Sequence, residues 1–200
     1  MLSFIRPQYE RFFAPIGLIC QKLGFTPNSL TIIGIVIGSI VVWTIPLHWW
    51  FTTILLILIS VLFDVADGAT ARATGKHSHL GELFDHCSDR YVEFFIICGI
   101  AREGTIPAQW PTFVIFGMVM ASYVRAKAEA NDPQGDYKFG LAERQEKIFI
   151  LILGFFGEMV YSPINWLLYS ILLVGVLSHL TVIQRLVVAY QRAKTLGKRN

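Results

Sequence analysis

Four aspartates at helical spacing are the residues of this sequence most suited to chemistry. They are Asp64, Asp67, Asp85 and Asp89. The first two are three positions apart and the last two are four apart, so each pair occupies one face of a helix. The first pair ends an apolar run, where a charge is expensive and needs a partner. If the two helices pack side by side, four carboxylates repel one another unless protons or cations neutralise them.

Oxygen ligands alone favour a hard cation, so the aspartates predict a site for Mg²⁺ or Mn²⁺ rather than zinc. Two such ions are a known device for holding the attacking and leaving oxygens in phosphoryl chemistry. Gly68 and Ala71 continue the face of the first pair and leave room for a phosphate-bearing group, while Arg72 adds a fixed positive charge. The alternative is that the aspartates cap helices and face water. The small residues and the arginine between them favour a binding site.

The elements that must position these residues are predicted to be membrane-spanning helices. Hydrophobic residues make up 54% of the 200 positions, and the mean hydropathy is +0.54. Several apolar stretches reach the ~20 residues that a spanning helix needs. We expect an all-α, polytopic membrane protein with six transmembrane helices. Their expected positions are 30–45, 51–74, 80–101, 110–130, 141–160 and 164–189.

Residues 1–200 are expected to form a single domain with three parts. Residues 1–25 are interpreted as an amphipathic helix in the membrane interface, because charged residues interrupt their apolar pattern; a first spanning helix is the alternative. Residues 26–192 form the expected six-helix core, which opens at the capping sequence Thr26-Pro27-Asn28-Ser29. Residues 193–200 form a basic tail.

The positive charges favour one orientation of these spans. Of the 17 lysines and arginines, all except Arg102 fall on the side of the two termini or at the helix ends that face it. Since positive charge is retained in the cytoplasm, both termini and the aspartate site are predicted to be cytoplasmic in a multi-pass protein of the cell membrane.

The spaced pattern D-x2-D-G-x2-A-R-x8-G-x3-D-x3-D resembles the signature of the CDP-alcohol phosphotransferases, with every position present. Its eight positions are Asp64, Asp67, Gly68, Ala71, Arg72, Gly81, Asp85 and Asp89. The resemblance implies that the four aspartates hold the metal ions and that Asp89 is also the catalytic base. It implies a site for the CDP group at Gly68, Ala71, Arg72 and Gly81, with Asn28 near the nucleotide. The resemblance also implies that the protein forms a homodimer and that it has no nucleic-acid partner.

The resemblance further implies a CDP-lipid donor, as in the compact microbial members, and an alcohol acceptor. Basic residues in three later places predict a pocket for a small anionic acceptor; they are Arg125, Lys127, Arg144 with Lys147 close after it, and Arg185. This arrangement resembles the phosphatidylinositol-phosphate and archaetidylinositol-phosphate synthases, which receive inositol phosphate. Glycerol 3-phosphate is the alternative acceptor. The basic residues also fit a simpler interpretation, contact with lipid headgroups under the positive-inside rule.

Two other kinds of site were considered. Intramembrane aspartates also line ion paths, so a divalent-cation transporter is the competing class; clustering of the aspartates at one helix end and the lack of a repeat favour the enzyme. A zinc site is a further alternative because three histidines, His77, His79 and His86, lie near the aspartates in the sequence. No cysteine lies at the spacing that zinc ligands usually have. The three cysteines form no CxxC pair and predict no disulfide framework.

Overall fold

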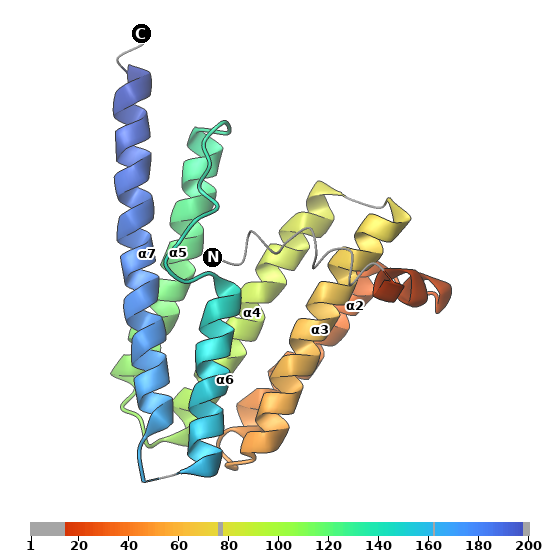
Figure 1. Cartoon of the computed structure of the whole chain (residues 1–200), viewed down its shortest axis with the longest axis vertical. Helices are drawn as coiled ribbons and strands as arrows, with labels where there is room; N and C mark the ends of the chain where they lie inside the picture. Colours follow the sequence, from red (N-terminus) through yellow and green to blue (C-terminus); the bar gives the residue numbers. More distant parts are fainter. Residues whose placement is uncertain (1–14, 76–77, 162, 198–200) are drawn as a thin grey trace. The chain divides into compact units, whose positions relative to one another are not determined.

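The computed structural model describes residues 15–75, 78–161 and 163–197, and every regular element in these ranges is helical (Figure 1). Residues 15–22 form a short helix. Six longer helices follow: α2 (Pro27–Thr44), α3 (Trp50–Thr74), α4 (His79–Glu103), α5 (Gln109–Asn131), α6 (Arg144–Val160) and α7 (Trp166–Gly197). The all-α expectation is confirmed.

Local signals account for where these helices begin and end. The side chains of Thr26 and Ser29 cap the first turn of α2 reciprocally, as the sequence predicts. Gly75 ends α3 in the left-handed conformation, with φ 63°. Glu143 caps α6, which therefore begins at residue 144 rather than 141. Helix α7 continues to Gly197 because residues 190–196 include no proline or glycine, so part of the expected tail is helical.

The chain divides into two compact units, residues 1–99 and 100–200. In the first unit, α2 and α3 pack against each other through glycines of α2. The Ser60 hydroxyl donates a hydrogen bond to the Gly34 carbonyl at 2.8 Å. A Cβ at Gly38 would lie 3.1 Å from both Ser60 Oγ and a Val92 methyl carbon of α4. Small residues one turn apart therefore let the helix backbones approach closely.

In the second unit, α5 and α6 each pack against α7. A Cβ at Gly117 of α5 would lie 2.8 Å from the His179 ring, which stacks on Phe113 at 4.2 Å between ring centroids. Gly154 of α6 faces Ser170 of α7 so closely that any side chain there would clash. Both contacts again depend on a glycine.

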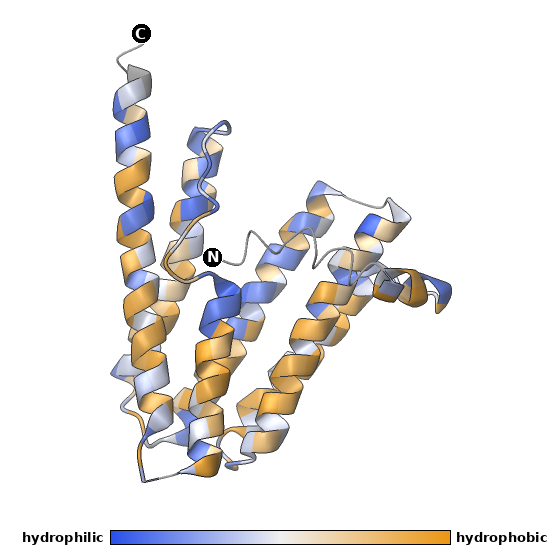
Figure 2. Cartoon of the chain, in the orientation of Figure 1, coloured by the Kyte–Doolittle hydropathy of each residue, from blue (hydrophilic) through white to orange (hydrophobic). Residues whose placement is uncertain are grey.

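The apolar surface of the helices is typical of a membrane protein. Among the described residues, α2, α3 and the 166–195 part of α7 are long and apolar enough to cross a bilayer. Figure 2 shows that α3 is hydrophobic over most of its length and hydrophilic at its C-terminal end. Large apolar side chains lie exposed on these helices, among them Val36, Leu55, Leu58, Leu173 and Ile183. Exposed apolar surface of this extent is consistent with a membrane protein. The count of six spans stays a prediction.

The expected N-terminal interfacial helix falls mostly on residues 1–14, outside the described residues. Residues 15–22 are helical, and Gly17 within them is buried. A Cβ at Gly17 would lie 2.5 Å from the Ala69 carbonyl carbon of α3. This short helix therefore packs on the part of α3 that directly follows Asp67.

We expect Gly38→Leu to destabilise the protein, since the added side chain has no room between Ser60 and Val92. Overpacking of this kind costs about 1–3 kcal/mol, which should lower the Tm by several degrees in detergent. The matched control is Val36→Leu on the same helix, where the side chain is 57% exposed and the Tm should stay unchanged. Equal Tm values for the two variants would contradict the close helix packing.

Candidate functional site

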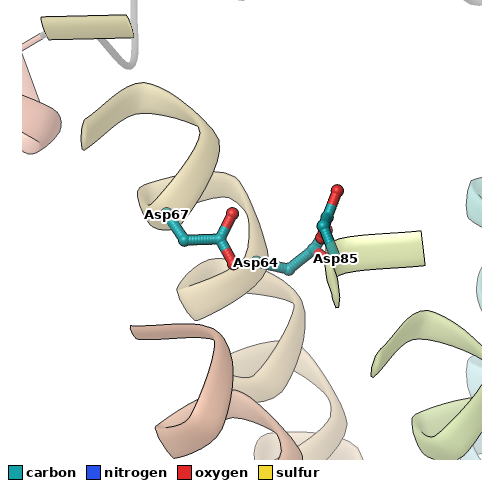
Figure 3. A group of neighbouring side chains, drawn as sticks. All are labelled: Asp64, Asp67 and Asp85. Atoms are coloured by element: carbon teal, nitrogen blue, oxygen red, sulfur yellow. The ribbon is translucent and has the colours of Figure 1, made fainter. Parts of the chain in front are cut away.

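Three of the four aspartates come together between α3 and α4 (Figure 3). Asp64 and Asp67 lie one turn apart on α3, and Asp85 lies in the second turn of α4. Each offers a carboxylate oxygen, and these oxygens all lie within 4.8 Å of one another. The proximity that the spacing predicts is therefore observed for these three, while their role as metal ligands stays a prediction.

Asp67 is the most enclosed of the three, with 5% of the residue exposed. The Thr31 hydroxyl of α2 lies 2.5 Å from its Oδ2 and donates to it. The same hydroxyl lies 3.1 Å from the Pro27 carbonyl oxygen, one turn earlier in α2. This contact fixes one face of the Asp67 carboxylate and ties the site to the start of α2.

Asp89 lies one turn beyond Asp85 on α4 and outside the group of three. A guanidinium nitrogen of Arg90 is 3.7 Å from its Oδ2. Another nitrogen of Arg90 forms a 2.8 Å ion pair with Glu93, whose side chain is 1% exposed. Arg90 therefore stands between Asp89 and a buried carboxylate, which holds its positive charge beside Asp89.

The ligand set fits a hard divalent cation. Three carboxylates supply oxygen ligands and no sulfur, which suits Mg²⁺ or Mn²⁺ better than a softer metal. Their mutual repulsion in partly buried positions also needs positive charge to offset it. His79 is exposed, and His86 lies 4.0 Å from Glu82 on the same helix; His77 is outside the described residues. In the part of the chain that the structure describes, the clustered ligands are aspartates alone.

The residues expected to receive a nucleotide border the same helices. A Cβ at Gly68 would lie 3.3 Å from a guanidinium nitrogen of Arg72, so the missing side chain leaves a place for that group along α3. Ala71 is half-buried beside it. A Cβ at Gly81 of α4 would lie 3.9 Å from Asn28 Oδ1 of α2. Asn28 and Gly81, far apart in the sequence, are thus neighbours.

The residues expected to hold an anionic acceptor lie in the second unit. Arg125, near the end of α5, pairs with Glu129 at 2.9 Å, and Lys127 is exposed. Arg144 is the first residue of α6. Arg185 of α7 is 7% exposed, and its guanidinium donates to two carbonyl oxygens, Ala121 at 2.5 Å and Phe139 at 2.8 Å. Arg185 therefore joins α5, the following loop and α7.

Sequence reasoning missed two residues at these places, Thr31 and Glu93, which are 7% and 1% exposed. Lys147, which the sequence places with Arg144 among the basic residues of the later helices, is buried as well, at 3% exposed. Glu93 carries a signal in the sequence, because it follows Asp85 and Asp89 at the same spacing of four. Thr31 has no such signal, because its contact to Asp67 depends on how α2 packs against α3.

Known proteins that are similar to this chain in sequence include two synthases. The archaetidylinositol phosphate synthase of Pyrococcus horikoshii is 35% identical over 192 residues, which cover 96% of this chain and 98% of the relative. The phosphatidylinositol phosphate synthase of Mycolicibacterium smegmatis is 27% identical over 191 residues, covering 90% of this chain and 84% of the relative.

Two solved structures share the fold. The crystal structure of Mycobacterium tuberculosis phosphatidylinositol phosphate synthase with CDP-DAG bound has a TM-score of 0.80 and 25% identity, covering 90% of this chain and 94% of that one. The structure of the same enzyme in complex with manganese and citrate has a TM-score of 0.79, also at 25% identity, covering 89% and 88%.

The family model described as CDP-alcohol phosphatidyltransferase matches residues 25–189. This range contains all six long helices except the end of α7, together with the aspartates of the spaced pattern. The chain is an enzyme of the CDP-alcohol phosphatidyltransferase family.

Proposed function

We propose that this enzyme transfers a phosphatidyl or archaetidyl group from a CDP-lipid to inositol phosphate and releases CMP. The observation that carries the proposal is the group of three carboxylates within 4.8 Å, built by the residues of the spaced pattern. The acceptor is supported by relatives named archaetidylinositol phosphate synthase and phosphatidylinositol phosphate synthase, which match this chain over nearly its whole length. The donor is supported by the related structure that holds CDP-DAG.

Four aspartates are proposed to hold two Mg²⁺ or Mn²⁺ ions: Asp64, Asp67, Asp85 and Asp89. The related structure in complex with manganese supports this assignment. When bound, the ions offset negative charge on the diphosphate and on the departing CMP. The chain's own contribution is positional, since the Thr31 hydroxyl orients the Asp67 carboxylate and burial limits its movement.

The CDP portion of the donor is proposed to lie along α3 and α4. Its proposed contacts are Asn28, Gly68, Ala71, Arg72 and Gly81. The guanidinium of Arg72 offers several N–H donors in a fixed plane, which suits the oxygens of a diphosphate. The small residues at 68, 71 and 81 keep side chains out of the space that a nucleotide needs. Their positions beside Arg72 and Asn28 support this assignment.

The reaction is a displacement at phosphorus. The acceptor hydroxyl oxygen attacks the phosphorus on the lipid side of the diphosphate, and the bond from that phosphorus to the CMP oxygen breaks. The hydroxyl proton passes to the Asp89 carboxylate, the proposed general base. Arg90, which is paired with buried Glu93, places a positive charge beside the carboxylate that is proposed to accept this proton.

The phosphate of the acceptor is proposed to bind basic residues of the second unit: Arg125, Lys127, Arg144 and Arg185. Arginine suits a phosphate because its planar group donates two parallel hydrogen bonds. Buried Lys147, one turn beyond Arg144, adds positive charge at the same helix end. Arg185 also holds two backbone carbonyls, which fixes the plane of its guanidinium.

We further propose that the single 200-residue domain crosses the cell membrane six times, with both termini and the site in the cytoplasm. The distribution of lysine and arginine supports this orientation. The proposal includes the interfacial N-terminal helix and a homodimer, the latter on the family resemblance alone.

Removal of divalent cations should abolish CMP release, because the crowded carboxylates need cations to act on a diphosphate. A chelator should stop the reaction and excess Mg²⁺ or Mn²⁺ should restore it. Bound Mn²⁺, measured by electron paramagnetic resonance, should fall in Asp64→Asn but not in the control Asp136→Asn. Full activity in excess chelator, with no metal retained, would contradict the metal role.

Asp89→Asn should lower kcat by roughly a hundred- to ten-thousandfold while CDP-lipid binding persists, if this residue chiefly accepts the acceptor proton. Asp67→Asn should weaken binding of donor and metal as well. Donor affinity is measured by titration with a labelled CDP-lipid, and Glu82→Gln, exposed on the same helix as Asp89, is the control. Equal loss of donor affinity in both aspartate variants would remove the special role of Asp89.

The acceptor assignment is tested by CMP release with inositol phosphate, free inositol and glycerol 3-phosphate, each supplied separately with a CDP-lipid. Inositol phosphate should be the preferred acceptor. Arg144→Gln should then raise its KM roughly ten- to a hundredfold, the effect of losing a charged hydrogen bond to phosphate, while the KM for the donor changes little.

Arg144→Lys should restore the KM poorly, because an ammonium cannot reproduce the paired hydrogen bonds of a guanidinium. Lys194→Gln, exposed near the end of α7, is the control for general loss of positive charge. If free inositol works as well as its phosphate, the phosphate pocket is wrong. If glycerol 3-phosphate is preferred, the pocket stands and the named acceptor is wrong.

A further inference from the structure

The segment between α5 and α6, residues 132–143, contains no helix or strand, yet it lies against α7 (Figure 1). At its start, Arg192 of α7 donates to Asp132 Oδ2 at 2.7 Å and to the Gln134 carbonyl at 3.3 Å. Further along, Arg185 donates to the Phe139 carbonyl at 2.8 Å. The segment therefore runs antiparallel to α7, and two arginines of α7 that are seven positions apart, Arg185 and Arg192, hold it in place.

Asp132 is the centre of the first of these contacts. Its Oδ2 accepts hydrogen bonds from Arg192 and from the Tyr137 hydroxyl, the latter at 3.1 Å. Tyr137 is 2% exposed although it belongs to a loop. The hydrogen bond from Arg192 holds the pKa of Asp132 below its usual range, so the carboxylate stays charged at neutral pH. We call Asp132, Tyr137 and Arg192 the loop clasp.

Two glycines show how closely the segment is fitted. A Cβ at Gly135 would collide with the Tyr137 ring and lie 2.7 Å from Asp132 Oδ2. A Cβ at Gly140 would lie 2.7 Å from a Thr181 methyl group of α7. A side chain at Gly140 would push the segment away from α7, and one at Gly135 would displace Tyr137 and Asp132 within the loop. The two glycines therefore allow the compact conformation that the loop adopts beside α7.

The segment joins the places that are proposed to hold the acceptor phosphate. It leaves α5 just after Arg125 and Lys127 and leads directly into Arg144 at the start of α6. We propose that the loop clasp positions these basic residues for the acceptor, an inference that rests on the proposed function. Asp132, Tyr137 and Arg192 are then positioning residues that act on acceptor binding without touching the substrate.

Asp132→Asn and Arg192→Gln test the proposal by steady-state kinetics of the full-length enzyme with inositol phosphate and a CDP-lipid. Each should raise the KM for the acceptor roughly three- to tenfold, since a partly exposed charged contact is lost. The KM for the donor should stay within about twofold on the same scale. Asp136→Asn is the matched control, because Asp136 lies in the same loop and accepts a local hydrogen bond from the Lys138 amide.

The exchange Asp132→Arg with Arg192→Asp restores the pair with reversed charges. It should recover most of the acceptor KM that either single change loses, which a general loss of stability would not allow. Tryptic cleavage after exposed Lys138 reads the loop without using activity. It should be roughly three- to tenfold faster in the single variants than in the wild type or the control, in keeping with the same lost contact.

Faster cleavage with an unchanged acceptor KM would overturn the proposal, because the clasp would then hold the loop without positioning the acceptor site. Equal rises in the KM of donor and acceptor, or no recovery in the exchange variant, would overturn it too. If the wild type uses glycerol 3-phosphate instead of inositol phosphate, the proposed function fails by itself. The same comparison with glycerol 3-phosphate then decides the role of the clasp.

Discussion

Negative charge held where the apolar helix α3 meets the start of α4 is the constraint on which the rest of this protein depends. Asp64, Asp67 and Asp85 offer oxygens within 4.8 Å of one another, and Asp67 is almost fully enclosed. Water cannot stabilise such a group from all sides, so the protein must supply donors or attract cations. The Thr31 hydroxyl supplies one donor. The remaining demand for positive charge is what suits the site to metal ions and, through them, to a diphosphate.

Glycines make this arrangement possible. In a bilayer, apolar side chains gain little by leaving lipid for protein, so helices associate through close packing and hydrogen bonds. Gly34 and Gly38 bring α2 against α3, and this places Thr31 beside Asp67. The short helix at residues 15–22 reaches α3 in the same way, through Gly17. The surroundings of Asp67 are therefore a consequence of close helix contacts one or two turns away.

Arginine side chains make two kinds of contact in this chain. Arg90 forms an ion pair with buried Glu93 and places its charge beside Asp89. Arg185 donates to a carbonyl oxygen of the loop between α5 and α6, and Arg192 adds a second such contact to its ion pair with Asp132 of that loop. Backbone groups in such a segment need partners as much as those in a helix do, and a guanidinium can serve several of them from one position. The number of lysines and arginines in the sequence does not distinguish these two kinds of contact.

The sequence by itself determined the helices, the start of α2 and the pairing of aspartates on two helix faces, because apolar run length, capping residues and residue spacing act over a few turns. It did not place the end of α7, where a gradual change to polar residues leaves a continuing helix. It gave no sign of Thr31 beside Asp67, and it grouped Arg185 with the other basic residues although two of its hydrogen bonds go to carbonyls. Those contacts join residues 36 to 64 positions apart. Only the tertiary structure decided these contacts, because they depend on which helix faces meet. The pattern of neighbouring residues does not indicate which distant residue will lie opposite.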